Sequence, residues 1–272
     1  MSSRRRWQTL LALVITLAYL FPVYWMVATS LKLPADVQAV PPKWAPVPAT
    51  TSSFSSVWHN PVVGEALRNS VVISLGVMVL TLLLAAPATY AIGRVRMRGS
   101  SSAVMLLLIA QLLPSIVLAA PLFVILRKLH LTNTLTGLIL ADTTLTLPFA
   151  VIILRPLIMS VPAELEDAAR LDGCGGLGVL MRVMVPIVRP GLISTAAFSF
   201  LLGWGEFVFG LTINNDPSVQ PATVALQSFI GQFGTAWGSL MAVATIISIP
   251  VALVFAIFQR WIVSGLTAGS VR

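Results

Sequence analysis

The sequence predicts an all-helical membrane protein with six membrane-spanning helices. Apolar residues make up 57% of the 272-residue chain and charged residues only 10%, whereas a soluble globular domain carries about 25% charged residues. The mean hydropathy is +0.93. Apolar stretches close to the ~20 residues that a helix needs to cross a bilayer recur along the chain. The length suits a single transmembrane domain, 1–272, without a large soluble appendage.

The first predicted span covers residues 9–30 and follows a run of arginines at Arg4, Arg5 and Arg6. A cleaved signal peptide has a shorter apolar core of ~7–15 residues and a small-residue cleavage site, so we interpret this stretch as a retained helix. Residues 31–62 contain a dense group of prolines and a Ser/Thr cluster. Because proline opposes helix and strand interiors, we expect an extended loop outside the bilayer here.

Further spans are predicted at about 69–92, 103–127, 135–158, 191–213 and 239–260. They contain several prolines, which membrane helices tolerate where neighbouring helices satisfy the freed backbone groups. We expect these prolines to be packing kinks. The remaining segments are a loop over 160–190 and a tail over 261–272.

The positions of the basic residues predict the orientation. Six spans with a cytoplasmic N-terminus also place the C-terminus in the cytoplasm, and they put twelve of the 17 Lys and Arg residues inside, in agreement with the positive-inside rule. The net charge of +8 therefore reflects topology and gives no support to nucleic-acid binding. The twelve are Arg4, Arg5, Arg6, Arg94, Arg96, Arg98, Arg155, Arg170, Arg182, Arg189, Arg260 and Arg272.

The acidic residues of the chain are concentrated in the loop over 160–190. Four of the nine acidic residues lie within nine consecutive positions, at Glu164, Glu166, Asp167 and Asp172. Pro162 suits a first helical turn, and carboxylates near a helix N-terminus interact favourably with its dipole. Gly173 is the expected terminator. The pattern predicts a short helix, Ala163–Asp172, with an i,i+4 pair of Glu166 and Arg170 and a small apolar face formed by Leu165, Ala168, Ala169 and Leu171.

Several motifs are excluded as sites of chemistry. Gly173–Gly178 matches G-x-G-x-x-G, but no strand pattern precedes it, so we interpret it as a turn. The chain has no Gly-Lys dipeptide and therefore no standard P-loop. Two isolated histidines and the single Cys174 form no metal constellation and allow no internal disulfide. We predict no catalytic residues and no metal site, so the chain is not expected to be an enzyme.

A carboxylate within the fifth span is the main candidate for contact with a solute. Glu206 is costly at bilayer depth and should face the bundle interior or a watery cavity, with Trp204 beside it. The alternative is an interfacial carboxylate at the outer boundary. Gln111 and Asp142 are further candidates, although Asp142 could equally be an ordinary helix-end carboxylate.

The acidic helix carries a resemblance to a known family. Asp167-Ala168-Ala169, three residues, Gly173, nine residues and Val183-x-Val185-Pro186 resemble the cytoplasmic signature of permease subunits of binding-protein-dependent ABC importers. That signature is usually Glu-Ala-Ala, three residues, Gly, nine residues, Ile-x-Leu-Pro. The substitutions keep charge or apolar character. The alternative, without the resemblance, is a solvated connector between two spans.

Other blocks resemble the second permease subunit of the maltose-type carbohydrate branch. They include Phe21–Met26 with Ser30-Leu31-Lys32, and the tail from Gln259 to Val271. One departure is Trp204-Gly205-Glu206, where the family often has Trp-Asn-Glu or Trp-Asn-Asp. Any polar role at position 205 is therefore in doubt.

The resemblance implies a six-helix permease in the bacterial inner membrane that pairs with a homologous permease as a heterodimer. Two cytoplasmic ATPase subunits would bind ATP and Mg beneath it, while this chain binds no cofactor itself, and an extracytoplasmic protein would deliver a sugar. The predicted helix would be the coupling helix, with a second ATPase contact in the tail. The implied coupling residues are Glu164, Glu166, Asp167, Ala168, Ala169, Leu171, Asp172 and Gly173, and the tail residues are Gly265, Leu266, Thr267, Ala268 and Gly269.

Three alternatives stay open. Similar permeases import other polar solutes such as glycerol phosphate. A secondary transporter would need no ATPase, but such carriers usually have repeated halves with paired broken helices, and no repeat is evident. A structural scaffold would leave the acidic helix unexplained.

Overall fold

The computed structural model describes residues 3–95, 99–231 and 234–267, and it describes the side chains of these residues except those of 3–6 and 262–267. The chain divides into two compact units. Unit 1 comprises Met1–Gly64 with Ala225–Pro250, and unit 2 comprises Glu65–Val224 with Val251–Arg272.

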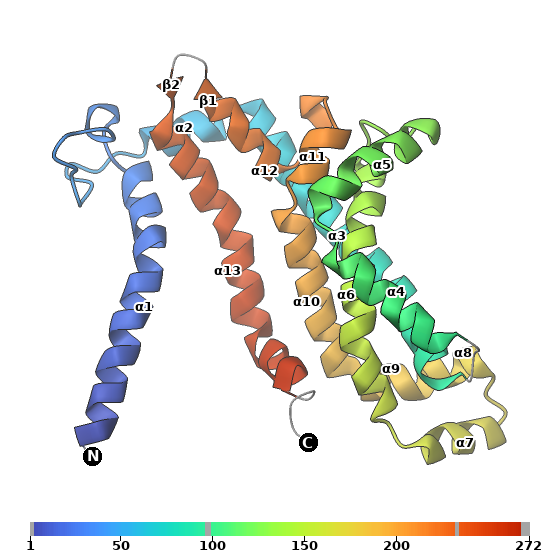
Figure 1. Cartoon of the computed structure of the whole chain (residues 1–272). Helices are drawn as coiled ribbons and strands as arrows, with labels where there is room; N and C mark the ends of the chain where they lie inside the picture. The colour runs from blue at the N-terminus through green and yellow to red at the C-terminus, as the bar shows by residue number, and fades with distance from the viewer. Residues whose placement is uncertain (1–2, 96–98, 232–233, 268–272) are drawn as a thin grey trace. The chain divides into compact units, whose positions relative to one another are not determined.

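Helices make up most of both units (Figure 1). The first half of the chain contains α1 (Ser3–Ser30), a 3₁₀ turn (Pro34–Asp36), α2 (Ser52–Trp58), α3 (Pro61–Arg94), α4 (Ser100–Leu112), α5 (Ser115–Lys128) and α6 (Leu135–Met159). The second half contains α7 (Ala163–Leu171), α8 (Gly176–Val179), a π-helical turn (Leu180–Met184), α9 (Val185–Ile187), α10 (Arg189–Gly205), α11 (Val208–Ile213), a 3₁₀ turn (Pro217–Val219), α12 (Ala222–Ala225), a 3₁₀ turn (Leu226–Phe229), β1 (Ile230–Gly231), β2 (Gly234–Thr235) and α13 (Trp237–Thr267). The two short strands pair antiparallel.

Among the described residues, four helices are long and apolar enough to cross a membrane: Trp7–Ser30, Pro61–Arg94, Leu135–Met159 and Trp237–Trp261. Two bent pairs bring the number of candidate spans to six if each pair is one span. The prediction of a helical membrane protein is confirmed. The sequence did not predict the strand pair.

The third predicted span, 103–127, is not one continuous helix. It consists of α4 and α5, which meet at 104°. Leu113 has φ −73° and ψ 126° and Pro114 follows with φ −62° and ψ 138°, both extended. A residue before proline is forced out of the helical region and proline lacks the N–H that would continue the helix. The expectation of a simple kink was therefore wrong at Pro114.

The fifth predicted span, 191–213, is also interrupted. Helix α10 ends at Gly205, Glu206 is extended with φ −66° and ψ 135°, and α11 begins at Val208. A further bend of 84° lies between Gly176–Ile187 and Arg189–Gly205. The loop predicted over 160–190 is therefore largely helical after Gly176.

Three boundaries differ from the expected ones. The segment 31–62, expected to be extended, contains α2. Helix α3 begins at Pro61, earlier than the predicted residue 69, because the first helical position needs no N–H from proline and the side chain of Asn60 accepts a hydrogen bond from Val62 N at 3.1 Å. Helix α13 runs to Thr267, so the predicted tail 261–272 begins inside a helix.

Unit 2 has its core between α3, α6, α10 and the short helices that cover them. One cluster joins Ile73 and Val77 of α3 to Leu138 and Ala141 of α6 and to Phe209 of α11. Buried hydroxyls also connect the helices, since Oγ1 of Thr81 and Oγ1 of Thr146 lie 2.6 Å apart. Asn69 Nδ2 donates to the carbonyls of Ser218 at 2.8 Å and Gln220 at 3.1 Å. These contacts fix the segment after α11 to α3.

In unit 1, the end of α1 is held by aromatic packing. The Lys32 ammonium lies 3.9 Å from the centre of the Trp25 ring, and the Trp44 ring meets Trp25 edge-on at 5.6 Å. Lys32 is only 2% exposed, and burial lowers the pKa of its ammonium although Asp36 opposes that shift. The Trp25 ring is therefore fixed on more than one side.

Candidate functional site

Helix α7 begins and ends at the residues that favour its termini. Pro162 precedes it in an extended conformation, with φ −57° and ψ 135°. At the other end, Gly173 has φ +85°, its N–H donates to the Arg170 carbonyl at 3.0 Å, and Cys174 N–H donates to the Ala169 carbonyl at 2.9 Å. This pair of hydrogen bonds is a Schellman motif, which favours glycine at the left-handed position. The chain therefore reverses sharply after α7.

The inner side of α7 carries a buried carboxylate. Glu166 is 5% exposed. Its Oε2 accepts a hydrogen bond from the Tyr90 hydroxyl at 3.1 Å, and its Oε1 lies 3.1 Å from Nε of Arg94. Arg170 Nη2 lies 3.5 Å from Oε2, so the predicted i,i+4 pair is present. A buried charge is costly unless it is paired, and here α3 supplies the partners.

Arg94 also binds the end of α6. Its Nη2 donates to the Ile158 carbonyl at 2.8 Å and to the Val161 carbonyl. The last carbonyls of a helix have no intrahelical partner, and a guanidinium has five donors in a fixed fork. One side chain of α3 therefore connects the end of α6 to α7 through Glu166.

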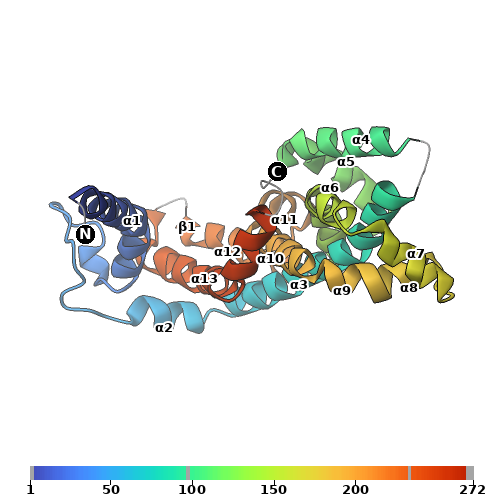
Figure 2. The ribbon, with the colours of Figure 1, turned by 90° about the horizontal axis from the view of Figure 1, so that it is seen from below.

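The apolar contacts follow the same side of α7. Ala169 is buried in a cluster with Ile158 and Val161, which precede α7, and with Val179 and Met184, which follow it. Figure 2 shows α7 beside α8. Helix α7 and the segment Gly176–Ile187 therefore pack together within unit 2.

The outer side of α7 is exposed and mixed in character. Leu171 is 90% exposed. The predicted small apolar face was wrong at one position, because Ala169 points into the protein with Glu166, whereas the other three members face outward. The exposed candidates are Glu164, Leu165, Asp167, Ala168, Leu171, Asp172 and Gly173.

Sequence reasoning missed Tyr90 and Arg94, the partners of Glu166. Their spacing of four residues at the end of a span was the available signal, since i and i+4 positions share a helix face. That spacing does not indicate which loop the two side chains meet. Of the predicted tail residues, Gly265, Leu266 and Thr267 end α13, and Ala268 and Gly269 lie outside the described residues.

Glu206, the main solute-path candidate, lies at the break between α10 and α11. Its carboxylate accepts hydrogen bonds from Phe209 N at 2.8 Å and Gly210 N at 3.0 Å, and its carbonyl accepts one from Thr223 Oγ1 at 2.5 Å. The first N–H groups of a helix need such an acceptor. The half-buried carboxylate therefore has a structural role as the cap of α11.

The other path candidates are distributed over the bundle. Trp204 is buried, with its ring stacked on Phe200 at a centroid distance of 5.8 Å. Gln111 is exposed on α4, two residues before the break. Asp142 of α6 is 2% exposed, and none of the described residues gives its Oδ1 a hydrogen bond. Asp142 is thus a buried carboxylate with one unsatisfied oxygen.

The described residues contain no group of three or more His, Cys, Asp or Glu side chains that could hold a metal ion. The carboxylates of α7 are either paired with cations or exposed. The site can therefore hold a helix rigidly against its bundle and present an acidic and apolar outer surface, which suits a mechanical contact with another protein.

Comparisons with known proteins agree over most of the chain. Residues 85–268 match the family described as binding-protein-dependent transport system inner membrane component. The chain is 33% identical over 268 residues to the diacetylchitobiose uptake system permease protein DasC of Streptomyces coelicolor, covering 98% of this chain and 97% of DasC. It is 35% identical over 276 residues to the trehalose transport system permease protein SugB of Mycobacterium tuberculosis, covering 100% of both.

A solved structure shows the same fold. A chain of a bacterial ABC transporter involved in the import of the acidic polysaccharide alginate superposes with a TM-score of 0.82 at 21% identity, over 96% of this chain and 98% of that one. The sequence match spans more than half of the chain, and the resemblance at α7 lies within it. The chain belongs to the family of binding-protein-dependent transport system inner membrane components.

Proposed function

We propose that this chain is one of two membrane-spanning subunits of an ATP-driven sugar importer in a bacterial inner membrane. The observation that carries the proposal is the family match, which includes α7. The relatives DasC and SugB are named for uptake of diacetylchitobiose and trehalose, and both align with almost the whole chain. A sugar is therefore the solute class that we assign.

In this proposal, α7 is the coupling helix. Its exposed residues Glu164, Leu165, Asp167, Ala168, Leu171 and Asp172 contact one ATPase subunit, which binds ATP and Mg. The buried Glu166 and Ala169 instead attach α7 to its own bundle through α3 and α6. Movement of the ATPase subunits would therefore be transmitted to the spans because α7 is not free to slide.

We infer the remaining partners from the description of the family as a component of a binding-protein-dependent transport system. A homologous permease completes the pathway, and an extracytoplasmic binding protein delivers the sugar. The N- and C-termini lie in the cytoplasm, and residues Gly265, Leu266, Thr267, Ala268 and Gly269 make a second contact with the ATPase subunits. Glu206, Trp204 and Gln111 remain the candidates for the solute path.

Co-purification with reconstituted transport tests the proposal. A tagged chain should bring down a second permease and an ATPase subunit with a P-loop. In proteoliposomes, the complex with its binding protein should take up radiolabelled sugar only when ATP is hydrolysed. Uptake of glycerol 3-phosphate instead of any sugar would contradict the solute class. Uptake driven by an ion gradient without ATP would contradict the importer class.

A further inference from the structure

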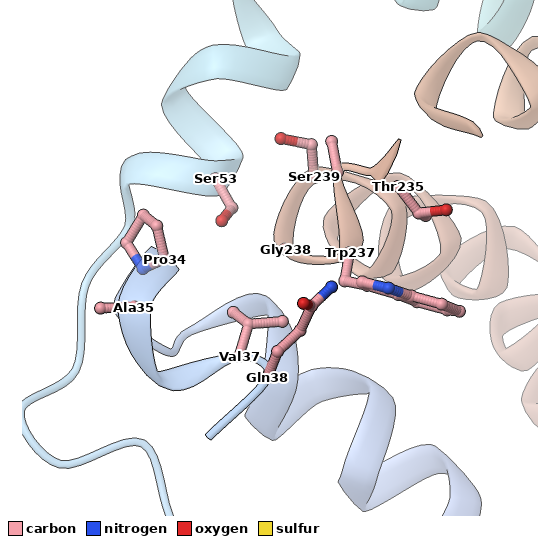
Figure 3. Close-up of a pocket in the computed structure, with 10 residues that line it drawn as sticks. Pro34, Ala35, Val37, Gln38, Ser53, Thr235, Trp237, Gly238 and Ser239 are labelled. Atoms are coloured by element: carbon pink, nitrogen blue, oxygen red, sulfur yellow. The ribbon is translucent and has the colours of Figure 1, made fainter. Parts of the chain in front are cut away.

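Two hollows lie at the C-terminal end of α1, and every residue that lines them belongs to unit 1. The larger has a volume of about 390 Å³ and lies between the loop after α1, the start of α2 and the start of α13 (Figure 3). The smaller has a volume of about 210 Å³ and extends toward Trp25 and Thr29. Gln38 and Trp237 line both. The larger hollow is within the ~300–1,000 Å³ typical of small-molecule sites.

The hollows offer hydrogen-bonding groups. In Figure 3 the Gln38 side chain extends toward Trp237, and the Ser53 hydroxyl points into the space that the labelled residues enclose. An amide can donate and accept, and so can a hydroxyl. In the smaller hollow, Thr29 is buried and none of the described residues hydrogen-bonds its Oγ1. A buried polar group without a partner is costly, so a ligand hydroxyl that reached Thr29 would be stabilised.

The hollows also offer aromatic surface. Trp237 is 42% exposed, although it stands at the start of an apolar helix where burial would be favourable. Trp25, which lines the smaller hollow, is held in place by the Lys32 ammonium and the Trp44 ring. Rigid aromatic side chains bind at low entropic cost, and their faces fit the C–H faces of a ring-shaped ligand.

The charge of the lining restricts the ligand further. The described residues that line the two hollows include no Asp, Glu, Lys, Arg or His. A phosphate or carboxylate in the larger hollow would be desolvated without a cation among the residues that line it, which is unfavourable. The lining therefore suits an uncharged ring with hydroxyl groups at its edge.

We propose that these hollows are an entry site for a neutral sugar, with one ring against Trp237 in the larger hollow and hydrogen bonds to Gln38 and Ser53. In the smaller hollow, the Thr29 hydroxyl would hydrogen-bond a second sugar ring. The proposal rests on the proposed function, which makes a sugar the solute and places this end of α1 outside the cell.

Site-directed labelling tests the proposal on the assembled transporter. In a Cys174→Ser background, Ala236→Cys places a thiol in the lining of the larger hollow, and Ser55→Cys places one on the exposed side of α2 away from it. Spheroplasts without binding protein are treated with a membrane-impermeant maleimide. The probes are trehalose, diacetylchitobiose and maltose, with any sugar that the uptake assay identifies and glycerol 3-phosphate for comparison.

We expect a transported sugar to slow the labelling of Ala236→Cys severalfold and to leave the labelling of Ser55→Cys unchanged. Glycerol 3-phosphate should slow the labelling of neither variant. Labelling of Ala236→Cys that no transported sugar slows would overturn the site while the importer function stands. An unreactive Ala236→Cys beside a reactive Ser55→Cys would also overturn the site while the importer function stands, because a partner subunit would then cover the larger hollow. Labelling of Ser55→Cys only after permeabilisation would overturn the orientation on which the proposal rests.

The sugar concentration that half-protects Ala236→Cys from labelling gives a second readout. We expect Gln38→Ala to raise this concentration about fivefold, as for the loss of one hydrogen bond. Trp237→Ala should raise it more, and Trp237→Phe should restore part of the loss. Trp58→Ala, which removes an exposed ring outside the hollows, is the matched control. An unchanged half-protecting concentration in Trp237→Ala at normal subunit assembly would overturn the proposal.

Discussion

Glu166 is a positioning residue, because its carboxylate contacts Tyr90 and Arg94 of its own chain. Removing one partner of a buried ion pair leaves an uncompensated charge and costs about 3–5 kcal/mol. We expect Glu166→Arg and Arg94→Glu each to lower the melting temperature of the purified complex and to reduce uptake strongly. The double variant should recover part of both, because the pair is restored with reversed charges.

The matched control for this cycle is Glu65→Arg, a charge reversal at an exposed position of the same helix, α3. It should leave the melting temperature nearly unchanged. If the double variant were no better than the two single variants combined, the two residues would not be energetically coupled and α7 would need another attachment.

Gly173 ends α7 with a positive φ, and a side chain there is strained even though nothing blocks the space that a Cβ would occupy. We expect Gly173→Ala to destabilise this turn by about 1 kcal/mol and to lower uptake, measured beside the melting temperature. Gly175→Ala is the control, because Gly175 has φ −72° and equally open space. Equal effects of the two substitutions would contradict the role of the left-handed turn.

Glu206 caps α11, and it is also a candidate for the solute path. Glu206→Ala should cost about 1 kcal/mol through loss of the cap and lower the melting temperature. Phe209 N and Gly210 N bond to different oxygens of the carboxylate, so Glu206→Gln keeps an acceptor for one of the two and should destabilise the protein less than Glu206→Ala. If Glu206→Gln nevertheless abolishes uptake at normal stability, the charge acts on the solute. If uptake follows stability in both variants, capping is its whole role.

At the scale of elements, the exposed side of α7 is the surface on which coupling depends. Ala168→Asp adds a carboxylate to this side without disturbing the buried Glu166 or Ala169. We expect it to abolish uptake while the chain stays in the membrane, and to reduce co-purification of the ATPase subunit. Ala168→Ser keeps a small side chain and should be close to wild type. Normal uptake by Ala168→Asp would count against coupling through α7.

The extent of α7 was predictable because its signals are local. Pro162 and Gly173 mark the two ends, and the structure has the helix at Ala163–Leu171 against a predicted Ala163–Asp172. The inward direction of Glu166 was not predictable, since its partner Tyr90 is 76 residues away in sequence. Amphipathicity alone predicts that a carboxylate faces water, and here a partly buried arginine and a buried tyrosine override that preference.

The breaks within the spans could not be predicted from the sequence pattern either. Pro87, Pro121 and Pro148 lie inside continuous helices, whereas Pro114 separates α4 from α5. An apolar residue precedes each of the four prolines, and only Pro114 is followed by a polar one, Ser115. A single serine is tolerated in a helix and does not by itself predict a break. The difference depends on tertiary packing, because α4 packs against α6 while α5 packs against α11.

At the scale of the whole molecule, the orientation can be tested with the native cysteine. Cys174 is free and partly exposed just after α7, on the side that we assign to the cytoplasm. We expect it to react with a membrane-impermeant maleimide only after cells are permeabilised. Ser55→Cys in a Cys174→Ser background should react in intact spheroplasts. Labelling of Cys174 from outside would invert the topology and remove α7 from the ATPase subunits.

The near-perpendicular bend at Val188 determines how a displacement of α7 would be transmitted through unit 2. The segment Gly176–Ile187 meets α10 at 84°, and this segment packs against α7. A displacement along the axis of Gly176–Ile187 is therefore directed almost perpendicular to the axis of α10. In the proposed orientation, a short movement of α7 on the cytoplasmic side would thus displace the N-terminal end of α10 within the plane of the membrane and tilt the helix, rather than move it along the membrane normal.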